Sequence, residues 1–180
     1  MAFFSRNIGL ILKTFLYQIV MSIFGFMIYG ATYKNTVLLI VGQVTVALFF
    51  FYIMVTQMYE KGAKNCEYDR CHGENSSVGA GFLFALIAFL PTILLSFFSL
   101  LSPPFAADGT VLNGGGYVAY LMNKSFLQGM YSGIYQVLVP PVQGTDVLNG
   151  QSLWFLIGAF PGWIVCGVSY LIGYLQFKKN

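Results

Sequence analysis

The residues with the clearest chemical potential lie close together, in the stretch CEYDRCHGENSS at residues 66–77. It contains two of the three cysteines and the only histidine of the chain, namely Cys66, Cys71 and His72. Thiolates and imidazole are ligands that zinc prefers in proteins. A Cys-Cys-His order is also close to the C-x-x-C-H pattern of haem attachment. Metal binding or redox chemistry is therefore the chemistry that these three residues suggest.

The spacing argues against both readings. Four residues separate Cys66 from Cys71, whereas the haem pattern has two. A structural zinc site needs about four ligands. These three residues would need a neighbouring carboxylate, such as Glu67 or Asp69, or a second chain. We therefore expect no cofactor and keep a metal or redox role of residues 66–72 as a second alternative.

Composition indicates which solvent surrounds the chain. Of the 180 residues, 57% are hydrophobic and only 8% are charged, against roughly 25% charged in a soluble domain. Such a small number of charged groups cannot cover the surface of a globular domain in water. We therefore expect most of the chain to face lipid. The net charge of +3 is too small to indicate nucleic acid as a partner.

Four stretches are long and apolar enough to cross a bilayer, which takes about 20 residues. They are residues 8–29, 36–58, 78–101 and 153–175. Each must be helical, because an open strand would leave backbone groups unpaired in hydrocarbon. The small residues in YGATYK are poorly placed for signal-peptide cleavage, which favours an uncleaved first helix. The prediction is an all-α, single integral membrane domain over residues 1–180.

The segment 102–152 contains a fifth, weaker helical pattern at residues 117–139. Apolar side chains recur there at helical spacing, but polar residues such as Asn123, Lys124 and Gln128 interrupt the run. Pro140 and Pro141 end it. We expect an interfacial or re-entrant helix, or one packed against the bundle, in preference to a fifth crossing.

The basic residues predict the orientation. With four crossings, seven of the nine Lys and Arg residues fall on one side, and only Lys34 and Lys124 fall on the other. The positive-inside rule then predicts a multi-pass protein of the cell membrane with cytoplasmic N and C termini. Residues 59–77 become a cytoplasmic loop. Glu60 and Lys64 could pair within it if the second helix continued, although Gly62 weakens that continuation.

The fourth span carries a stripe of small residues consisting of Gly158, Gly162, Cys166 and Gly173. Small residues let helix backbones approach closely in lipid, where apolar side chains gain little by leaving the acyl chains. The stripe predicts a packing seam, within this bundle or between two copies. Pro161 in this span and Pro91 in the third are candidate kinks.

Two polar side chains lie inside spans. Lys13, about two turns into the first, can extend its ammonium back to the headgroups. Gln43 in the second needs a hydrogen-bond partner, from another helix or in a polar pathway. No span contains Asp, Glu, His or Arg, so proton coupling has no obvious carrier. The sequence also lacks H-E-x-x-H, G-x-S-x-G and P-loop patterns, so an enzyme is not expected.

The motifs YEKGAKN after the second span and FPGW with YLIGYLQF in the fourth give the chain a likeness to a known group. It resembles uncharacterised small four-span integral membrane proteins of Gram-positive bacteria, and the resemblance implies no activity. The leading hypothesis is a non-enzymatic subunit or accessory protein that contacts a membrane partner or a second copy of itself. The alternative is a small transporter or permease component, with Lys13, Gln43, Pro91 and Pro161 along its path.

Overall fold

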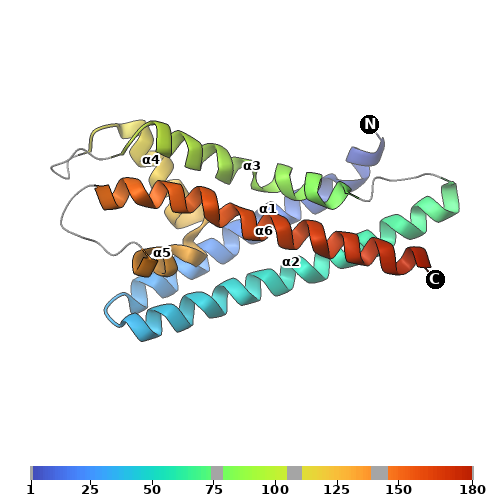
Figure 1. Cartoon of the computed structure of the whole chain (residues 1–180), viewed down its shortest axis with the longest axis horizontal. Helices are drawn as coiled ribbons and strands as arrows, with labels where there is room; N and C mark the ends of the chain where they lie inside the picture. The colour runs from blue at the N-terminus through green and yellow to red at the C-terminus, as the bar shows by residue number, and fades with distance from the viewer. Residues whose placement is uncertain (1, 74–78, 105–110, 139–145, 180) are drawn as a thin grey trace. The chain divides into compact units, whose positions relative to one another are not determined.

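The computed structural model describes the backbone of residues 2–73, 79–104, 111–138 and 146–179, and the side chains of these segments apart from 2–6, 146–151 and 179. Four long α-helices dominate it (Figure 1). They are α1 (Ala2–Thr32), α2 (Thr36–His72), α3 (Ala80–Leu101) and α6 (Asp146–Lys179). Shorter helical segments lie between α3 and α6.

The protein is an all-α membrane protein, as predicted. Each long helix contains a stretch long and apolar enough to cross a bilayer, within Asn7–Thr32, Thr36–His72, Ala80–Leu101 and Ser152–Lys178. In the parts of the chain that the structure describes, no residue belongs to a β-strand. Large apolar side chains are exposed along all four helices, as expected for surfaces that contact acyl chains.

The chain forms two compact units, and each long helix contributes to both. Unit 1 contains residues 1–16, 50–89 and 160–180, and unit 2 contains residues 17–49 and 90–159. Two of the unit boundaries fall next to Pro91 and Pro161, which lie inside α3 and α6. Proline has no backbone N–H, so it leaves the carbonyl four residues earlier without its helical donor.

Asparagine side chains mark where two of the helices begin. Asn35 Oδ1 accepts hydrogen bonds from the backbone N–H groups of Val37 and Leu38 at the start of α2. Asn113 Oδ1 accepts from Gly115 and Gly116 at the start of α4 (Gly114–Met122). Each cap satisfies donors that have no partner within the helix.

Residues 59–72 do not form the predicted loop. They continue α2 without interruption to His72, and Gly73 follows with a positive φ of 65°. At 1.5 Å per residue, a helix of 37 residues is about 55 Å long, well beyond a hydrocarbon core of about 30 Å. The extension is stabilised because several of its side chains pack within unit 1. Asn65, Cys66 and Asp69 are each at most 5% exposed.

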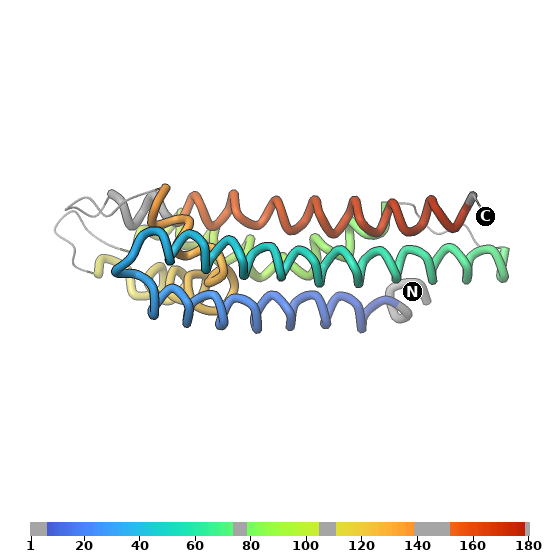
Figure 2. Tube along the Cα trace, turned by 90° about the horizontal axis from the view of Figure 1, so that it is seen from below, coloured from blue at the N-terminus to red at the C-terminus, as the bar shows by residue number. Residues whose placement is uncertain are grey.

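The segment between α3 and α6 is helical but broken. It runs through α4, a π-helical turn η1 (Asn123–Leu127), a 3-10 turn η2 (Gly129–Tyr131) and α5 (Ser132–Leu138). Figures 1 and 2 show the chain changing direction between α4 and α5. The helical segment predicted at 117–139 is thus present over its described residues, 117–138, but it is interrupted at 123–131. The segment is buried over most of 127–133, so it packs against the rest of unit 2.

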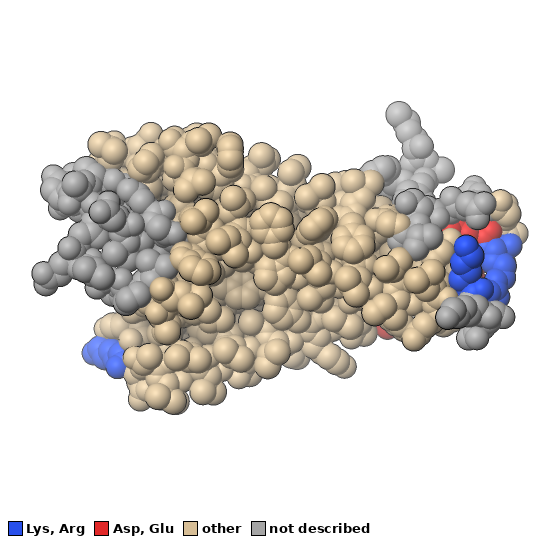
Figure 3. All heavy atoms as spheres, in the orientation of Figure 1, with Lys and Arg blue, Asp and Glu red and all other residues tan. Residues whose placement is uncertain are grey.

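Charged side chains occupy little of the surface. Figure 3 shows one face, on which Lys, Arg, Asp and Glu gather in small groups and most of the described surface carries none. This distribution fits a protein whose described flanks contact lipid.

Candidate functional site

The three residues considered as candidate metal ligands, Cys66, Cys71 and His72, are not brought together. Cys66 is buried, whereas Cys71 and His72 are exposed near the end of α2. The His72 ring stacks on Tyr68 at 3.9 Å between centroids, and its Nδ1 lies 3.0 Å from the Tyr68 carbonyl oxygen. Among the residues described, no three His, Cys, Asp or Glu side chains form a group suited to a metal ion.

The small-residue stripe of α6 packs against other helices of the same chain. A Cβ added at Gly162 would lie 2.7 Å from the Phe89 ring. One added at Gly158 would meet the Tyr135 hydroxyl, and one at Gly173 would meet the backbone of Tyr59. Cys166 is fully buried. The stripe therefore forms seams within each unit, not a surface left open for a partner.

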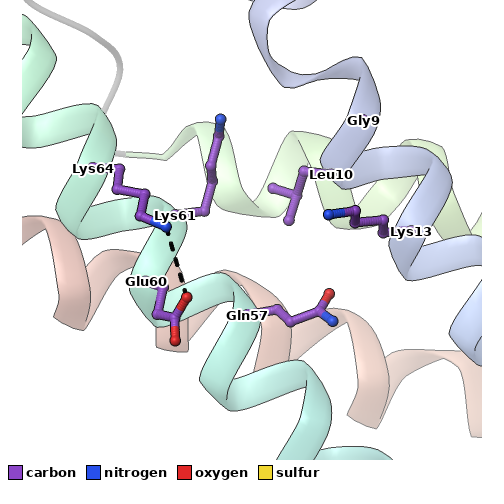
Figure 4. A pocket seen from close by; sticks show the side chains of 7 residues that line it. All are labelled: Gly9, Leu10, Lys13, Gln57, Glu60, Lys61 and Lys64. Carbon is purple, nitrogen blue, oxygen red and sulfur yellow. Dashed lines mark ion pairs between the residues drawn. The ribbon is translucent and has the colours of Figure 1, made fainter.

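Gln43 lies in the core of unit 2, with none of its surface exposed. Its Nε2 donates a hydrogen bond of 2.7 Å to the carbonyl oxygen of Gly25 in α1. Lys13, by contrast, is exposed and borders a pocket in unit 1 (Figure 4). The structure therefore assigns the two intramembrane polar residues to different surroundings.

A polar stripe on α1 faces the same core as Gln43. Gln18, Ser22 and Gly25 follow one another at spacings of four and three residues, so they share one helix face. Gln18 is 1% exposed and Ser22 is fully buried. On α3, Thr92, Ser96 and Ser99 repeat this spacing and are also buried.

Hydrogen bonds join the two stripes to the broken segment. Gln18 Nε2 donates to Thr92 Oγ1 at 2.6 Å and to the Leu127 carbonyl oxygen at 3.0 Å. Asn123 Nδ2 donates to Ser96 Oγ at 3.2 Å, and Ser96 Oγ donates to the Thr92 carbonyl oxygen at 2.7 Å. Polar side chains of α1, α3 and η1 thus form one buried network in unit 2.

Glycines allow the broken segment to approach α1 closely. A Cβ at Gly25 would collide with the backbone of Met130, and a Cβ at Gly129 would collide with the carbonyl of Ser22. Backbone atoms cannot move aside as a flexible side-chain end can. The turn at 128–131 therefore lies directly against the α1 face that carries Gln18 and Ser22.

The turn is also bonded on its other side. The Gln128 Nε2 donates to the Phe155 carbonyl oxygen, and its Oε1 accepts from the Tyr135 hydroxyl at 2.6 Å. Gln128 is thereby fixed between α5 and α6. Irregular backbone at membrane depth is tolerated where such contacts satisfy it or where it borders a polar cavity.

Four oxygen atoms of the most deeply buried side chains in this core have no hydrogen-bond partner among the described residues. Within the described residues, they belong to unit 2 side chains that are at most 1% exposed, namely Gln18 Oε1, Ser22 Oγ, Gln43 Oε1 and Asn123 Oδ1. Burying an unsatisfied polar group costs about 1–3 kcal/mol. Asn123 lies within the segment 123–133, and Gln18, Ser22 and Gln43 each contact it. The network therefore contains unpaired acceptors. A molecule rich in hydrogen-bond donors, or a cation, would bind favourably by contacting them.

Lys124, at the edge of this network, carries the only basic side chain described between α3 and α6. Its Nζ lies 3.2 Å from the Tyr120 hydroxyl and 5.7 Å from the Tyr29 ring centroid. Burial lowers the pKa of Lys124. Burial also raises the pKa of Tyr120, and the neighbouring Tyr29 and Tyr117 raise it further. Aromatic faces and a hydroxyl stabilise the ammonium in this setting.

Most of the network was missed by sequence reasoning. Gln43, Asn123 and Gln128 were noticed as polar residues, but Gln18, Ser22 and Thr92 were not. The four-residue spacing of polar side chains in the first and third spans was the available signal. Polar residues that share a face of a spanning helix generally point into the protein.

Comparisons of the chain with protein-family models, curated proteins and solved structures found no match. The likeness to Gram-positive membrane proteins stays a prediction, and the site must be interpreted from its own chemistry.

Proposed function

We propose that this integral membrane protein, with its four helices able to cross a bilayer, is a small transporter or permease component that binds a small polar solute within unit 2. The observation that carries this proposal is the set of four buried oxygen atoms, without hydrogen-bond partners in the described part of the chain, beside a broken helix. Discontinuous helices in transporters commonly border the substrate site.

The open groups define the chemistry of the solute. Gln18, Gln43 and Asn123 present amide carbonyl oxygens, which only accept hydrogen bonds. The preferred ligand is therefore a small molecule rich in N–H or O–H donors, such as an amine or a polyol. A solute with acceptors alone would leave the amide oxygens unsatisfied.

Uptake into proteoliposomes tests the proposal. The wild-type protein should take up or be thermally stabilised by members of a panel of amines, polyols and amides, and Gln43→Leu should lose that response. Thr45→Val is the matched control, because Thr45 lies two residues away on α2, is exposed and bonds only its own helix at Val41. No response of the wild type to any donor-rich solute, or an unchanged response in Gln43→Leu, would refute the proposal.

A second proposal is that the protein works as a subunit or accessory protein, through contact with a membrane partner or a second copy. Supporting it is the part of α2 beyond a hydrocarbon-spanning length, which presents exposed Glu67, Arg70 and Cys71. Because the glycine stripe of α6 is already filled within the chain, we expect this end of α2 to make the contact. Crosslinking from Cys71 after mild detergent extraction should capture a partner or a dimer. Capture that persists unchanged in Cys71→Ser would argue against this surface.

We further propose that the protein lies in the cell membrane with both termini cytoplasmic. The seven basic residues predicted inside all belong to unit 1, and Lys34 and Lys124 belong to unit 2, which supports one common side for the seven. They are Arg6, Lys13, Lys61, Lys64, Arg70, Lys178 and Lys179.

Thiol labelling tests this orientation. Cys71 is exposed whereas Cys66 and Cys166 are buried, so an impermeant maleimide should report Cys71 alone. Labelling should require permeabilised cells and should disappear in Cys71→Ser. Labelling of intact cells would reverse the orientation.

A further inference from the structure

Lys124 places a positive charge beside the polar network of unit 2. It directly follows Asn123, whose Nδ2 donates to Ser96 Oγ at 3.2 Å. The Ser132 hydroxyl donates to the Lys124 carbonyl oxygen at 3.0 Å, which holds this part of the backbone against α5. Unlike Asn123, the Lys124 side chain is only partly buried. Lys124 therefore lies next to the network and keeps some of its surface accessible.

Tyr29 relates the ammonium group to the polar stripe of α1. Tyr29 lies four residues beyond Gly25 and seven beyond Ser22, so it continues the same helix face. The Lys124 Nζ lies 5.7 Å from the Tyr29 ring centroid and 5.5 Å from the Tyr120 ring centroid. The charge is thus held near two aromatic rings, at the end of the α1 face that carries the buried polar groups.

No carboxylate neutralises this charge among the described side chains of unit 2. The unit contains two acidic residues, Asp108 and Asp146, and the side chains of both lie outside the described parts. Within the described residues, the Lys124 ammonium has one hydrogen-bond acceptor, the Tyr120 hydroxyl at 3.2 Å. An ammonium group has three N–H donors. The remaining donors can therefore serve a ligand.

The neutral groups around Lys124 do not replace the hydration that burial removes. Burial lowers the pKa of Lys124 even though a hydroxyl and two aromatic rings contact its ammonium. A carboxylate forms a charge-assisted hydrogen bond, which stabilises the ammonium more than a neutral acceptor does. A cationic amine at the same place would be repelled. The setting of Lys124 therefore favours an anionic group.

We propose that Lys124 is a specificity-determining residue of the unit 2 site and binds the carboxylate of an organic solute. This inference rests on the proposed function and narrows its ligand to a small hydroxy acid, with glycerate as the model solute. The hydroxyl groups supply the donors that the proposed function requires, and Lys124 contacts the carboxylate. A solute with the same hydroxyl groups but a positive charge should bind more weakly.

Thermal stabilisation of the full chain in detergent, measured against solute concentration, tests the inference. Glycerate, glycerol and serinol are matched solutes, because they share a three-carbon chain and differ in charge. The wild type should bind glycerate about tenfold more tightly than glycerol, since a hydrogen bond to a charged group contributes at least this much, and serinol should bind most weakly. Lys124→Gln should lose the preference for glycerate but still bind glycerol. Lys124→Arg keeps the charge and should retain the preference.

The matched control is Lys34→Gln, because Lys34 is the other basic residue of unit 2 and is exposed. It removes the same charge and should keep the wild-type preference. Without solute, Lys124→Gln should unfold no earlier than the wild type, because it removes a partly dehydrated charge.

The outcomes separate this inference from the proposed function. Equal binding of glycerate and glycerol by the wild type would overturn the role of Lys124 and leave the proposed function standing. An equal loss of preference in Lys34→Gln would also overturn it, in favour of a general charge effect. No response of the wild type to any of the three solutes would refute both.

Discussion

The two units bury polar side chains in opposite ways. In unit 1, Asn65 Nδ2 donates to Asn7 Oδ1 at 3.2 Å, and the Tyr174 hydroxyl donates to Asp69 at 3.0 Å. In unit 2, the amide groups of Gln18, Gln43 and Asn123 use their N–H donors but leave their carbonyl oxygens open. Both units bury amide side chains almost completely, yet among the described residues several such amide oxygens lack a partner in unit 2.

The difference follows from backbone regularity. The polar side chains of unit 1 project from continuous helices, so tyrosines of α6 can meet the extension of α2 at fixed positions. In unit 2, side chains of α1 and α2 face the segment 123–131, which leaves the α-helical pattern. Among the described residues, the amide oxygens of Gln18, Gln43 and Asn123 have no partner there. A network whose polar atoms are all paired stabilises the fold. A network with unpaired acceptors gains free energy when a ligand donates hydrogen bonds to them.

The largest expected effect is at the glycine contact of unit 2. Gly25→Val should destabilise the protein by about 3 kcal/mol, because the added side chain meets the Met130 backbone, which cannot shift cheaply. Thermal unfolding in detergent measures the loss. The control is Gly9→Val on the same helix, where a Cβ has nothing within 4 Å. Equal stability of the two variants would contradict the close approach of α1 and η2.

A smaller loss is expected in the closed network of unit 1. Tyr174→Phe removes a donor to the buried Asp69 carboxylate and should cost about 1–3 kcal/mol of unfolding free energy. Tyr52→Phe, at a side chain that is 68% exposed, should leave stability unchanged. If both substitutions cost the same, the pairing of Tyr174 with Asp69 does not stabilise unit 1.

In the open network, stability and ligand response should separate. Gln43→Met keeps the volume but removes the amide, and should cost about 1 kcal/mol or less because one carbonyl oxygen was already unsatisfied. The same variant should abolish solute-dependent stabilisation. Asn65→Leu in unit 1 should show the reverse, a larger stability loss with the solute response retained. Matching behaviour of these two variants would remove the distinction between the units.

The smallest effect is expected at the exposed ion pair. Glu60→Gln should change the unfolding free energy by less than about 0.5 kcal/mol, since the pair with Lys64 is solvated. Thermal unfolding at low and high salt checks this. A loss above 1 kcal/mol would show that the end of α2 depends on charge pairing more than on burial of Asn65 and Asp69.

Hydropathy alone predicted the four spanning helices, because lipid requires each crossing to satisfy its own backbone hydrogen bonds. It failed at the end of α2. The charges at 59–72 indicated a loop, since charged residues between spans are usually solvated there. The helix continues because Asn65, Cys66 and Asp69 bury one face within unit 1, and that burial depends on the distant Tyr170 and Tyr174.

The candidate site was predicted only in part. Gln43 was identified because a lone amide in an apolar run needs a partner. The contributions of Gln18, Ser22 and Thr92 were not, because their role depends on which side chains of α3 and η1 face them. Likewise the glycines of α6 predicted close packing, but not that the chain's own Phe89 and Tyr135 would fill the space.

The sequence by itself therefore determined the solvent of this protein, the number of helices able to cross a bilayer and the residues that allow close packing, because each depends on local composition and spacing. Only the tertiary structure decided where α2 ends, which polar atoms are paired and which residues surround Lys13. These depend on contacts between residues far apart in the sequence, such as Gln18 and Leu127, which are 109 positions apart. A hydrogen bond is fixed by the positions of both partners, and a linear pattern specifies only one of them.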